Sequence, residues 1–204
     1  MPENNKTPLD PDIASKIMEL TGKIAAVAMN AGRNSEDVNL MAVSKFHSVT
    51  KIRSALEFGH RLFGENRVQE AASKYPILKE EYPDLRLHLI GPLQTNKVRE
   101  AVKLFDVIET LDRPRLAEAL SKEQNKIGAC PNLFVQVNTG EEEKKSGVLP
   151  AETDNFISQC REELKLPVIG LMCIPPVNDE PALHFALLAE TARRHGLEYL
   201  SMGM

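Results

Sequence analysis

A lysine directly follows a short apolar run near the N-terminal end of the sequence. Residues 40–43 are apolar, and Ser44 and Lys45 come immediately after them. A run of this length predicts a short buried strand that delivers Lys45 at its carboxyl end. In parallel α/β folds, binding and catalytic groups gather at that end of the sheet. The competing interpretation is a surface lysine that ends the strand and keeps its ammonium group in water.

A lysine at a strand end has two kinds of chemistry. Its ammonium group can bind a phosphate as a point charge, and its neutral amine can attack an aldehyde to form a Schiff base. Burial favours the neutral amine that the second reaction needs. The sequence offers no Ser/His/Asp set beside Lys45, and its five histidines show no metal-ligand spacing, so we expect no metal site.

The rest of the chain alternates predicted strands with predicted helices. Strands are predicted at 39–43, 61–64, 85–90, 105–110, 132–138, 167–172 and 197–202. Helices are predicted at 10–31, 48–58, from about 66, and at 96–104, 112–127, 150–164 and 180–195. Asp10, Ser48 and Asp112 are the expected N-caps, and Phe58 is expected to face inward. This alternation predicts a parallel sheet with helices outside it.

The length of the chain and the number of repeats favour a (β/α)8 TIM barrel, with an open doubly wound sheet as the alternative. A complete barrel has eight strands, and this sequence supplies about seven. The predicted strands end in small, polar or glycine-rich segments, which suit a ligand-binding mouth. These segments lie at 64–66, 91–97, 138–140, 173–176 and 201–203.

The composition is that of a globular protein and limits the possible partners. Hydrophobic residues make up 42% of the 204 residues, so we predict one domain over 1–204, with residues 1–9 as a flexible tail. The net charge of −4 and the scattered Lys and Arg residues argue against a nucleic-acid partner. No apolar stretch is long enough to span a membrane. Cys130, Cys160 and Cys173 fit reduced thiols in a cytoplasmic protein.

Six motifs, in this order, resemble the pyridoxal phosphate homeostasis family of PLP-binding proteins. They are AVSK at 42–45, FGENRVQE at 63–70, HLIGPLQTNK at 88–97, VNTGEEEKKSGV at 137–148, GLMCIPP at 170–176 and LSMGM at 200–204. The resemblance covers nearly the whole chain after the N-terminal tail. It implies a β/α-barrel like the N-terminal domain of alanine racemase, which holds pyridoxal 5′-phosphate (PLP) as a lysine aldimine. It also implies a role in intracellular PLP (vitamin B6) homeostasis, without an established turnover.

The resemblance also implies roles for individual residues. Lys45 corresponds to the aldimine lysine, and Asn66 corresponds to a residue beside the pyridine ring. Ser201 and Gly203 correspond to the start of the phosphate-binding cup. His88 lies in a family motif without an assigned role.

The sequence departs from the family pattern in two places. Pro92 stands where many relatives have a histidine, so any role of that side chain is absent here. Family members also continue past the SMGM motif with a helix and a final barrel strand, whose Arg-Gly pair helps to bind phosphate. We therefore expect the last strand of the barrel to be missing from this chain.

Two enzymatic functions remain as alternatives. A fold-type III PLP enzyme, such as an amino-acid racemase, pairs its lysine with a tyrosine from a second domain. The tyrosines here are Tyr75, Tyr82 and Tyr199, within one predicted domain. A Schiff-base aldolase would need a carboxylate at a strand end, for which Glu65 and Glu109 are the candidates. We expect instead a cytoplasmic, monomeric PLP carrier or regulator whose partner is the cofactor itself.

Overall fold

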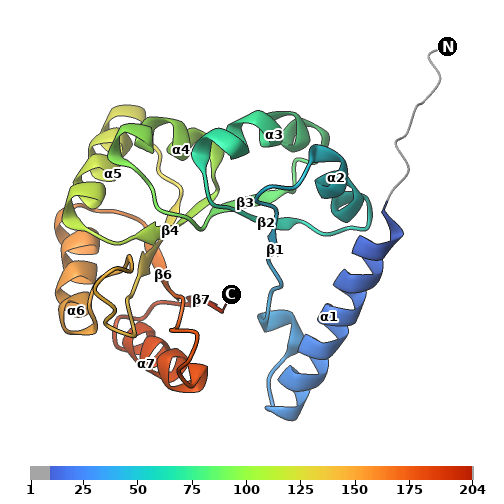
Figure 1. Ribbon diagram of the computed structural model, residues 1–204. Coiled ribbons are helices and arrows are strands. Elements are labelled where there is room, and N and C mark those ends of the chain that lie inside the picture. The colour runs from blue at the N-terminus through green and yellow to red at the C-terminus, as the bar shows by residue number, and fades with distance from the viewer. Residues whose placement is uncertain (1–9, 204) are drawn as a thin grey trace. The chain divides into compact units, whose positions relative to one another are not determined.

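The computed structural model describes residues 10–203, in which strands and helices alternate along the chain (Figure 1). The strands are β1 Ala42–Val43, β2 Leu62–Glu65, β3 Arg86–Leu89, β4 Val107–Leu111, β5 Asn132–Gln136, β6 Val168–Cys173 and β7 Tyr199–Met202. The helices are α1 Pro11–Asn30, α2 Val49–Glu57, α3 Val68–Glu81, α4 Val98–Leu104, α5 Pro114–Ile127, α6 Pro150–Ser158 and α7 Pro181–Arg194. Within the described residues, each predicted strand and helix is present, with its ends shifted by a few residues.

The strands follow one another across the sheet in chain order, from β1 to β7. The registered neighbours are parallel: Ala42 pairs with Phe63, for example, and His88 pairs with Val107. Parallel neighbours that are consecutive in the sequence need a crossover, which the helices supply. A doubly wound sheet reverses its strand order at a switch point, and no reversal occurs here. The strand order therefore excludes the open doubly wound alternative.

Within residues 10–203 the chain divides into two compact units, and the first comprises residues 10–65 together with Glu70–Leu87. The tail predicted over residues 1–9 lies outside the described residues. In this unit the N-caps are where the sequence places them. The Asp10 side chain accepts a hydrogen bond from Asp12 N at 3.1 Å at the start of α1. The Ser48 side chain accepts one from Lys51 N at 3.4 Å at the start of α2.

Strand β1 is shorter and less buried than the sequence predicts. It has two residues, and the side chains of residues 40–43 are half-buried rather than buried. The cause is the position of β1, which is the first strand in the sheet order and is registered with β2 alone among the described strands. The prediction of a fully buried strand over 40–43 is therefore wrong.

Two local predictions also fail, for reasons of backbone geometry. Asp112 is not the N-cap of α5, because Pro114 takes the first helical position and Arg113 therefore stands at the cap. Asp112 forms an ion pair with Arg113 instead. Phe58 lies one residue past the end of α2 and is 42% exposed, so it does not face inward as expected.

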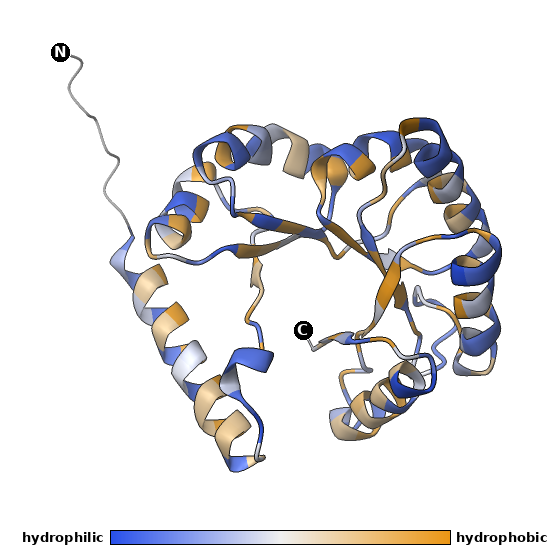
Figure 2. Ribbon diagram, turned by 180° about the vertical axis from the view of Figure 1, so that it is seen from behind, coloured by the Kyte–Doolittle hydropathy of each residue, from blue (hydrophilic) through white to orange (hydrophobic). Residues whose placement is uncertain are grey.

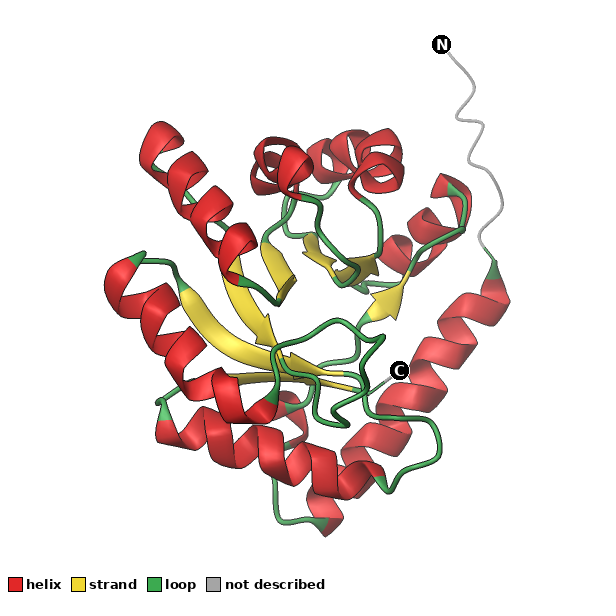
Figure 3. Cartoon of the chain, turned by 60° about the vertical axis from the view of Figure 1, so that its left-hand side comes forward, coloured by secondary structure: helices red, strands yellow, loops and turns green. Residues whose placement is uncertain are grey.

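The second unit comprises Asn66–Gln69 and, within the described part of the chain, residues 88–203. Its strands β4, β5 and β6 are almost completely buried. The hydropathy colours of Figure 2 show hydrophobic residues in the strands, and Figure 3 shows helices outside them. One face of these strands carries a core cluster of Val107, Phe134 and Met172. Helix α7 packs against β6 and β7. Strand β7, the last in the sheet order, is less buried, and Tyr199 in it is 51% exposed.

The three cysteines are free thiols, as predicted. Cys160 and Cys173 are buried, and burial raises the pKa of the Cys160 thiol to about 12. Of the helices in residues 10–203, none has both the length and the apolar character needed to cross a lipid bilayer.

Candidate functional site

Lys45 occupies the second position of a tight turn after β1, so the structure confirms its place at a strand end. His47 N donates to Ser44 O at 3.1 Å and closes the turn. Phe46 has a φ of 64°, a conformation that turns normally give to glycine or asparagine, and its side chain is 78% exposed. Lys45 is half-buried, and within residues 10–203 its ammonium group has neither an ion pair nor a hydrogen bond.

A buried hydrogen-bond network lies beside this turn. Ser44 Oγ donates to Glu65 Oε1 at 2.8 Å and lies 2.6 Å from the Tyr75 hydroxyl. Ser44 has a single hydroxyl proton, so its bond to Glu65 makes Tyr75 the donor of the second bond. Glu65 and Tyr75 are fully buried, and burial raises the pKa of the Tyr75 hydroxyl and keeps it protonated.

Glu70 and Lys74 lie one helical turn apart on α3 and reach the same turn. Lys74 Nζ lies 2.6 Å from Glu70 Oε1 and 3.1 Å from Glu65 Oε1, and it donates to Ser44 O at 3.2 Å. Glu70 Oε1 accepts a hydrogen bond from Phe46 N at 2.6 Å. Glu70 and Lys74 were not predicted as site residues, although their spacing of four residues on a predicted helix is typical of an ion pair on one helix face.

Asn66 follows β2 and belongs to the second unit. Its Oδ1 is buried and has no hydrogen-bond partner in the described part of the chain. The segment around it is tightly packed, because a Cβ atom on Gly91 would lie 2.2 Å from Asn66 O. Thr110 Oγ1 holds Gly91 in place by donating to its carbonyl oxygen at 2.9 Å. Asn66 Oδ1 is therefore a fixed acceptor that a ligand can satisfy.

Ser201 lies in one row with Gln136 and Met172 across β5, β6 and β7. Side chains in register on parallel strands point to the same face of the sheet, so Ser201 is on the face of the core cluster that contains Met172. Gln136 Oε1 on this face is buried and has no partner among the described residues. Gly203 follows β7, is exposed and has a φ of 103°.

His88 and Glu109 form a pair on the neighbouring strands β3 and β4. His88 Nδ1 lies 2.6 Å from Glu109 Oε1. Glu109 is 1% exposed, and its Oε2 has no partner within residues 10–203. Their contact could not be predicted from the sequence, because it depends on the register of the two strands.

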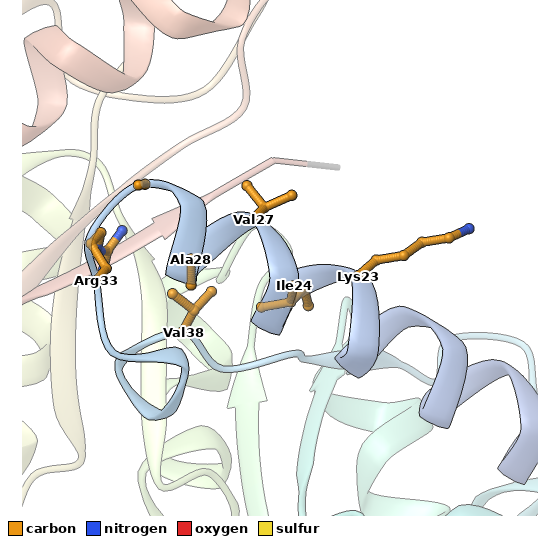
Figure 4. A pocket seen from close by; sticks show the side chains of 7 residues that line it. Lys23, Ile24, Val27, Ala28, Arg33 and Val38 are labelled. Carbon is orange, nitrogen blue, oxygen red and sulfur yellow. The ribbon is translucent and has the colours of Figure 1, made fainter.

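Pockets in the first unit border on α1. A pocket of about 540 Å³ lies between α1 and β1 and reaches Ser44 and His47, but Lys45 does not line it. A second pocket of about 340 Å³ lies at the C-terminal half of α1, where Ala28 faces Val38 (Figure 4). The lining of the second pocket is mostly apolar, so it lacks the converging polar groups of a small-molecule site.

Comparison with known proteins identifies close relatives. Residues 22–202 match the family model of the alanine racemase N-terminal domain. The chain is 35% identical over 202 residues to the pyridoxal phosphate homeostasis protein of Escherichia coli K12, covering 95% of this chain and 86% of that protein. It is 38% identical over 203 residues to the protein of the same name from Vibrio cholerae, covering 94% and 86%.

Solved structures of similar sequence and fold include a protein with PLP bound. PipY of Synechococcus elongatus without PLP is 34% identical, with a TM-score of 0.78 and coverage of 94% of this chain and 88% of that chain. PipY with PLP bound is 30% identical, with a TM-score of 0.73 and coverage of 94% and 97%. An alanine racemase of Clostridium difficile is 13% identical, with a TM-score of 0.67 and coverage of 82% and 46%, which shows a shared fold alone. The predicted fold class, the barrel of the alanine racemase N-terminal type, is confirmed.

Proposed function

Because the chain belongs to the family of pyridoxal phosphate homeostasis proteins, we propose that it binds PLP through Lys45 and acts in PLP homeostasis. A relative, PipY, has been solved with PLP bound. The observation that carries the proposal is the state of Lys45, which follows β1 in a fixed turn. No carboxylate within residues 10–203 pairs with its ammonium group, so the amine is available for a ligand.

PLP supplies an aldehyde, whose carbon forms a C=N bond with a neutral lysine amine while the aldehyde oxygen leaves as water. We propose that Asn66 accepts a hydrogen bond from the bound cofactor, as its buried and unpartnered Oδ1 suggests. We propose further that the Ser201 hydroxyl and the Gly203 N–H donate to the phosphate. A glycine with positive φ suits this task, because its backbone can approach an anion closely.

We propose that the protein carries or regulates PLP and is not an enzyme, and that it is a cytoplasmic monomer with no nucleic-acid or membrane partner. The names of the relatives support the first part, since they describe homeostasis and not a reaction. The racemase alternative has weaker support, because the alanine racemase of Clostridium difficile shares the fold at only 13% identity. The Tyr75 hydroxyl is also engaged by Ser44 and buried, which makes it a poor proton-transfer partner for Lys45.

The experiment is to incubate the protein with PLP, reduce it with borohydride and locate the label by peptide mass analysis. We expect one pyridoxyl group on Lys45 and a visible absorption band before reduction. Lys45→Ala should lose the band and keep its melting temperature, because the half-buried side chain has no polar partner in the described structure. Lys51→Ala, a matched change at an exposed position of helix α2, is the control that should keep the band. A label on Lys51 or Lys97 would contradict the proposal.

A further inference from the structure

We propose that Glu70 and Lys74 are positioning residues that fix the backbone on both sides of Lys45. This inference rests on the proposed function, in which Lys45 is the covalent anchor of PLP. It assigns a role to the ion pair of Glu70 and Lys74 on α3, neither of which is among the residues to which the resemblance gives a role toward PLP. The relevant contacts all lie within the first compact unit.

The two residues hold the peptide groups that flank Lys45. Lys74 Nζ donates to the carbonyl oxygen of Ser44, which belongs to the peptide group before Lys45, at 3.2 Å. Glu70 Oε1 accepts from the N–H of Phe46, which belongs to the peptide group after Lys45, at 2.6 Å. The 2.6 Å ion pair between Lys74 and Glu70 joins the side chains that make these two hydrogen bonds. The backbone of Lys45 is thereby fixed to a single helix.

Burial makes these contacts strong enough to hold a strained turn. The Lys74 side chain is 11% exposed and the Glu70 side chain is 20% exposed, so solvent screens their pairing only weakly. Glu65, fully buried, adds a second carboxylate at 3.1 Å from Lys74 Nζ. Phe46 adopts a φ that a bulky residue avoids, so the turn needs external support to persist. The hydrogen bond from Phe46 N to Glu70 is that support.

Loss of Glu70 or Lys74 should change the rate at which PLP attaches covalently to Lys45 and not the non-covalent affinity for the cofactor. A nucleophile held close to its attack geometry reacts much faster than a mobile one, and small misplacements cost large factors in rate. If Glu70 and Lys74 act only on the position of Lys45, their loss slows attachment and leaves the non-covalent contacts of the ligand intact.

The test compares Lys74→Met and Glu70→Gln with the wild type in two assays. Stopped-flow absorption measures the rate at which PLP attaches, and titration measures the affinity for pyridoxine 5′-phosphate, which has an alcohol in place of the aldehyde. For Lys74→Met we expect attachment to slow by about tenfold or more, with the affinity for pyridoxine 5′-phosphate unchanged within about twofold. Glu70→Gln retains an acceptor for Phe46 N, so we expect a smaller effect in the same direction.

The control is the pair Glu19 and Lys23, which has the same residue types and spacing on α1 but is exposed. Glu19→Gln and Lys23→Met should change neither assay. Equal attachment rates in wild type and Lys74→Met would overturn the inference, as would parallel losses of rate and affinity, which indicate general damage. If Lys74→Met does not fold, Glu70→Gln decides by the same two criteria. Absence of an adduct at Lys45 in the wild type would instead refute the proposed function.

Discussion

Ser44 Oγ donates a hydrogen bond of 2.8 Å to Glu65 Oε1, which joins the residue after β1 to the last residue of β2. A backbone bond from Ser44 N to Gly64 O at 3.0 Å runs beside it. Strand β1 has two residues and half-buried side chains, so apolar packing alone holds it weakly. The position of the lysine turn therefore depends on a buried polar network around Glu65 Oε1, whereas Glu65 Oε2 is buried and has no hydrogen-bond partner among the described residues.

Glu65→Gln tests the contribution of this network to stability. The change removes a buried negative charge that lies 3.1 Å from Lys74 Nζ, and it places an amide group where the carboxylate accepted from Ser44. We expect the free energy of unfolding to fall by about 1–3 kcal/mol, as when a buried charged hydrogen-bond partner is lost. Urea denaturation measures it, with exposed Glu19→Gln as the control. An unchanged midpoint for Glu65→Gln would mean that the network does not stabilise the unit.

Phe46→Asn tests the strain in the lysine turn. Phe46 has a φ of 64° and gains little from packing, because its side chain is 78% exposed. Asparagine tolerates this conformation at lower cost, so we expect the free energy of unfolding to rise by about 1 kcal/mol. Phe46→Val, a β-branched residue, should lower it instead. Thermal melting of the three proteins gives the order, and a less stable asparagine variant would refute the strain argument.

The regular parts of the fold are predictable because their signals are local. Asp10 and Ser48 cap helices within three residues of their own positions, and apolar runs mark the strands. The strand order also follows, since alternating strands and helices leave few parallel arrangements. The position of Lys45 at a strand end belongs to this predictable part, because it depends on the run directly before it.

The supporting network is not predictable, because its members are far apart in the sequence. Ser44 meets Tyr75 across 31 residues and Lys74 across 30 residues. Their contact depends on how α3 packs beside the turn, which no local pattern specifies. The partial exposure of residues 40–43 is not predictable for a similar reason. A short apolar run looks the same in the sequence whether its strand lies in the middle of the sheet or at the end of the sheet order.

Gly91→Ala tests the close packing beside Asn66. A Cβ atom at this position would lie 2.2 Å from Asn66 O and 2.7 Å from its Cα, so the backbone must move. We expect a loss of about 1–3 kcal/mol of stability, together with weaker PLP binding if Asn66 contacts the cofactor. Gly22→Ala in α1 is the matched control, because no atom lies within 4 Å of its Cβ position. We expect this control to raise the free energy of unfolding by about 0.5–1 kcal/mol. Equal melting temperatures for the two variants would contradict the packing argument.

Asp154→Asn tests the ion pair that links α6 to the end of α7. Asp154 Oδ1 lies 2.8 Å from Arg194 Nη2 and 2.9 Å from His195 Nε2, and the hydrogen bond from Arg194 is the main cause of its lowered pKa. A lowered carboxyl pKa adds stability above the pKa of the unfolded chain, and this stability is lost as pH falls through the folded-state value. The side chains of Asp154 and Arg194 are half-exposed, so solvent weakens their pairing. We therefore expect Asp154→Asn to lower the free energy of unfolding by less than about 1 kcal/mol at pH 7.

The measurement that tests this explanation is the pH dependence of the difference in unfolding free energy between wild type and Asp154→Asn. The free energies of unfolding of wild type and Asp154→Asn, measured by denaturation, should differ at about pH 5, and this difference should shrink as the solution is acidified below about pH 4. The same gap should narrow in high salt, because a half-exposed pair is screened. A gap that widens on acidification would show that Asp154 acts through packing and not through its charge.

The proposal that the protein is not an enzyme predicts no rapid exchange at the α-carbon of amino acids. Such exchange needs a base placed on the substrate, with a second group opposite it in a racemase. Tyr75, the tyrosine nearest to Lys45 in the described network, donates its hydroxyl to Ser44 and is fully buried, and burial raises its pKa. We therefore expect NMR to show no enzyme-dependent loss of the α-proton signal of alanine in deuterated buffer containing PLP. Free PLP and the Lys45→Ala variant provide the background rates. Exchange far above both background rates would support the PLP-enzyme alternative. If the Tyr75→Phe variant then lost this exchange, Tyr75 would be identified as the group opposite the base.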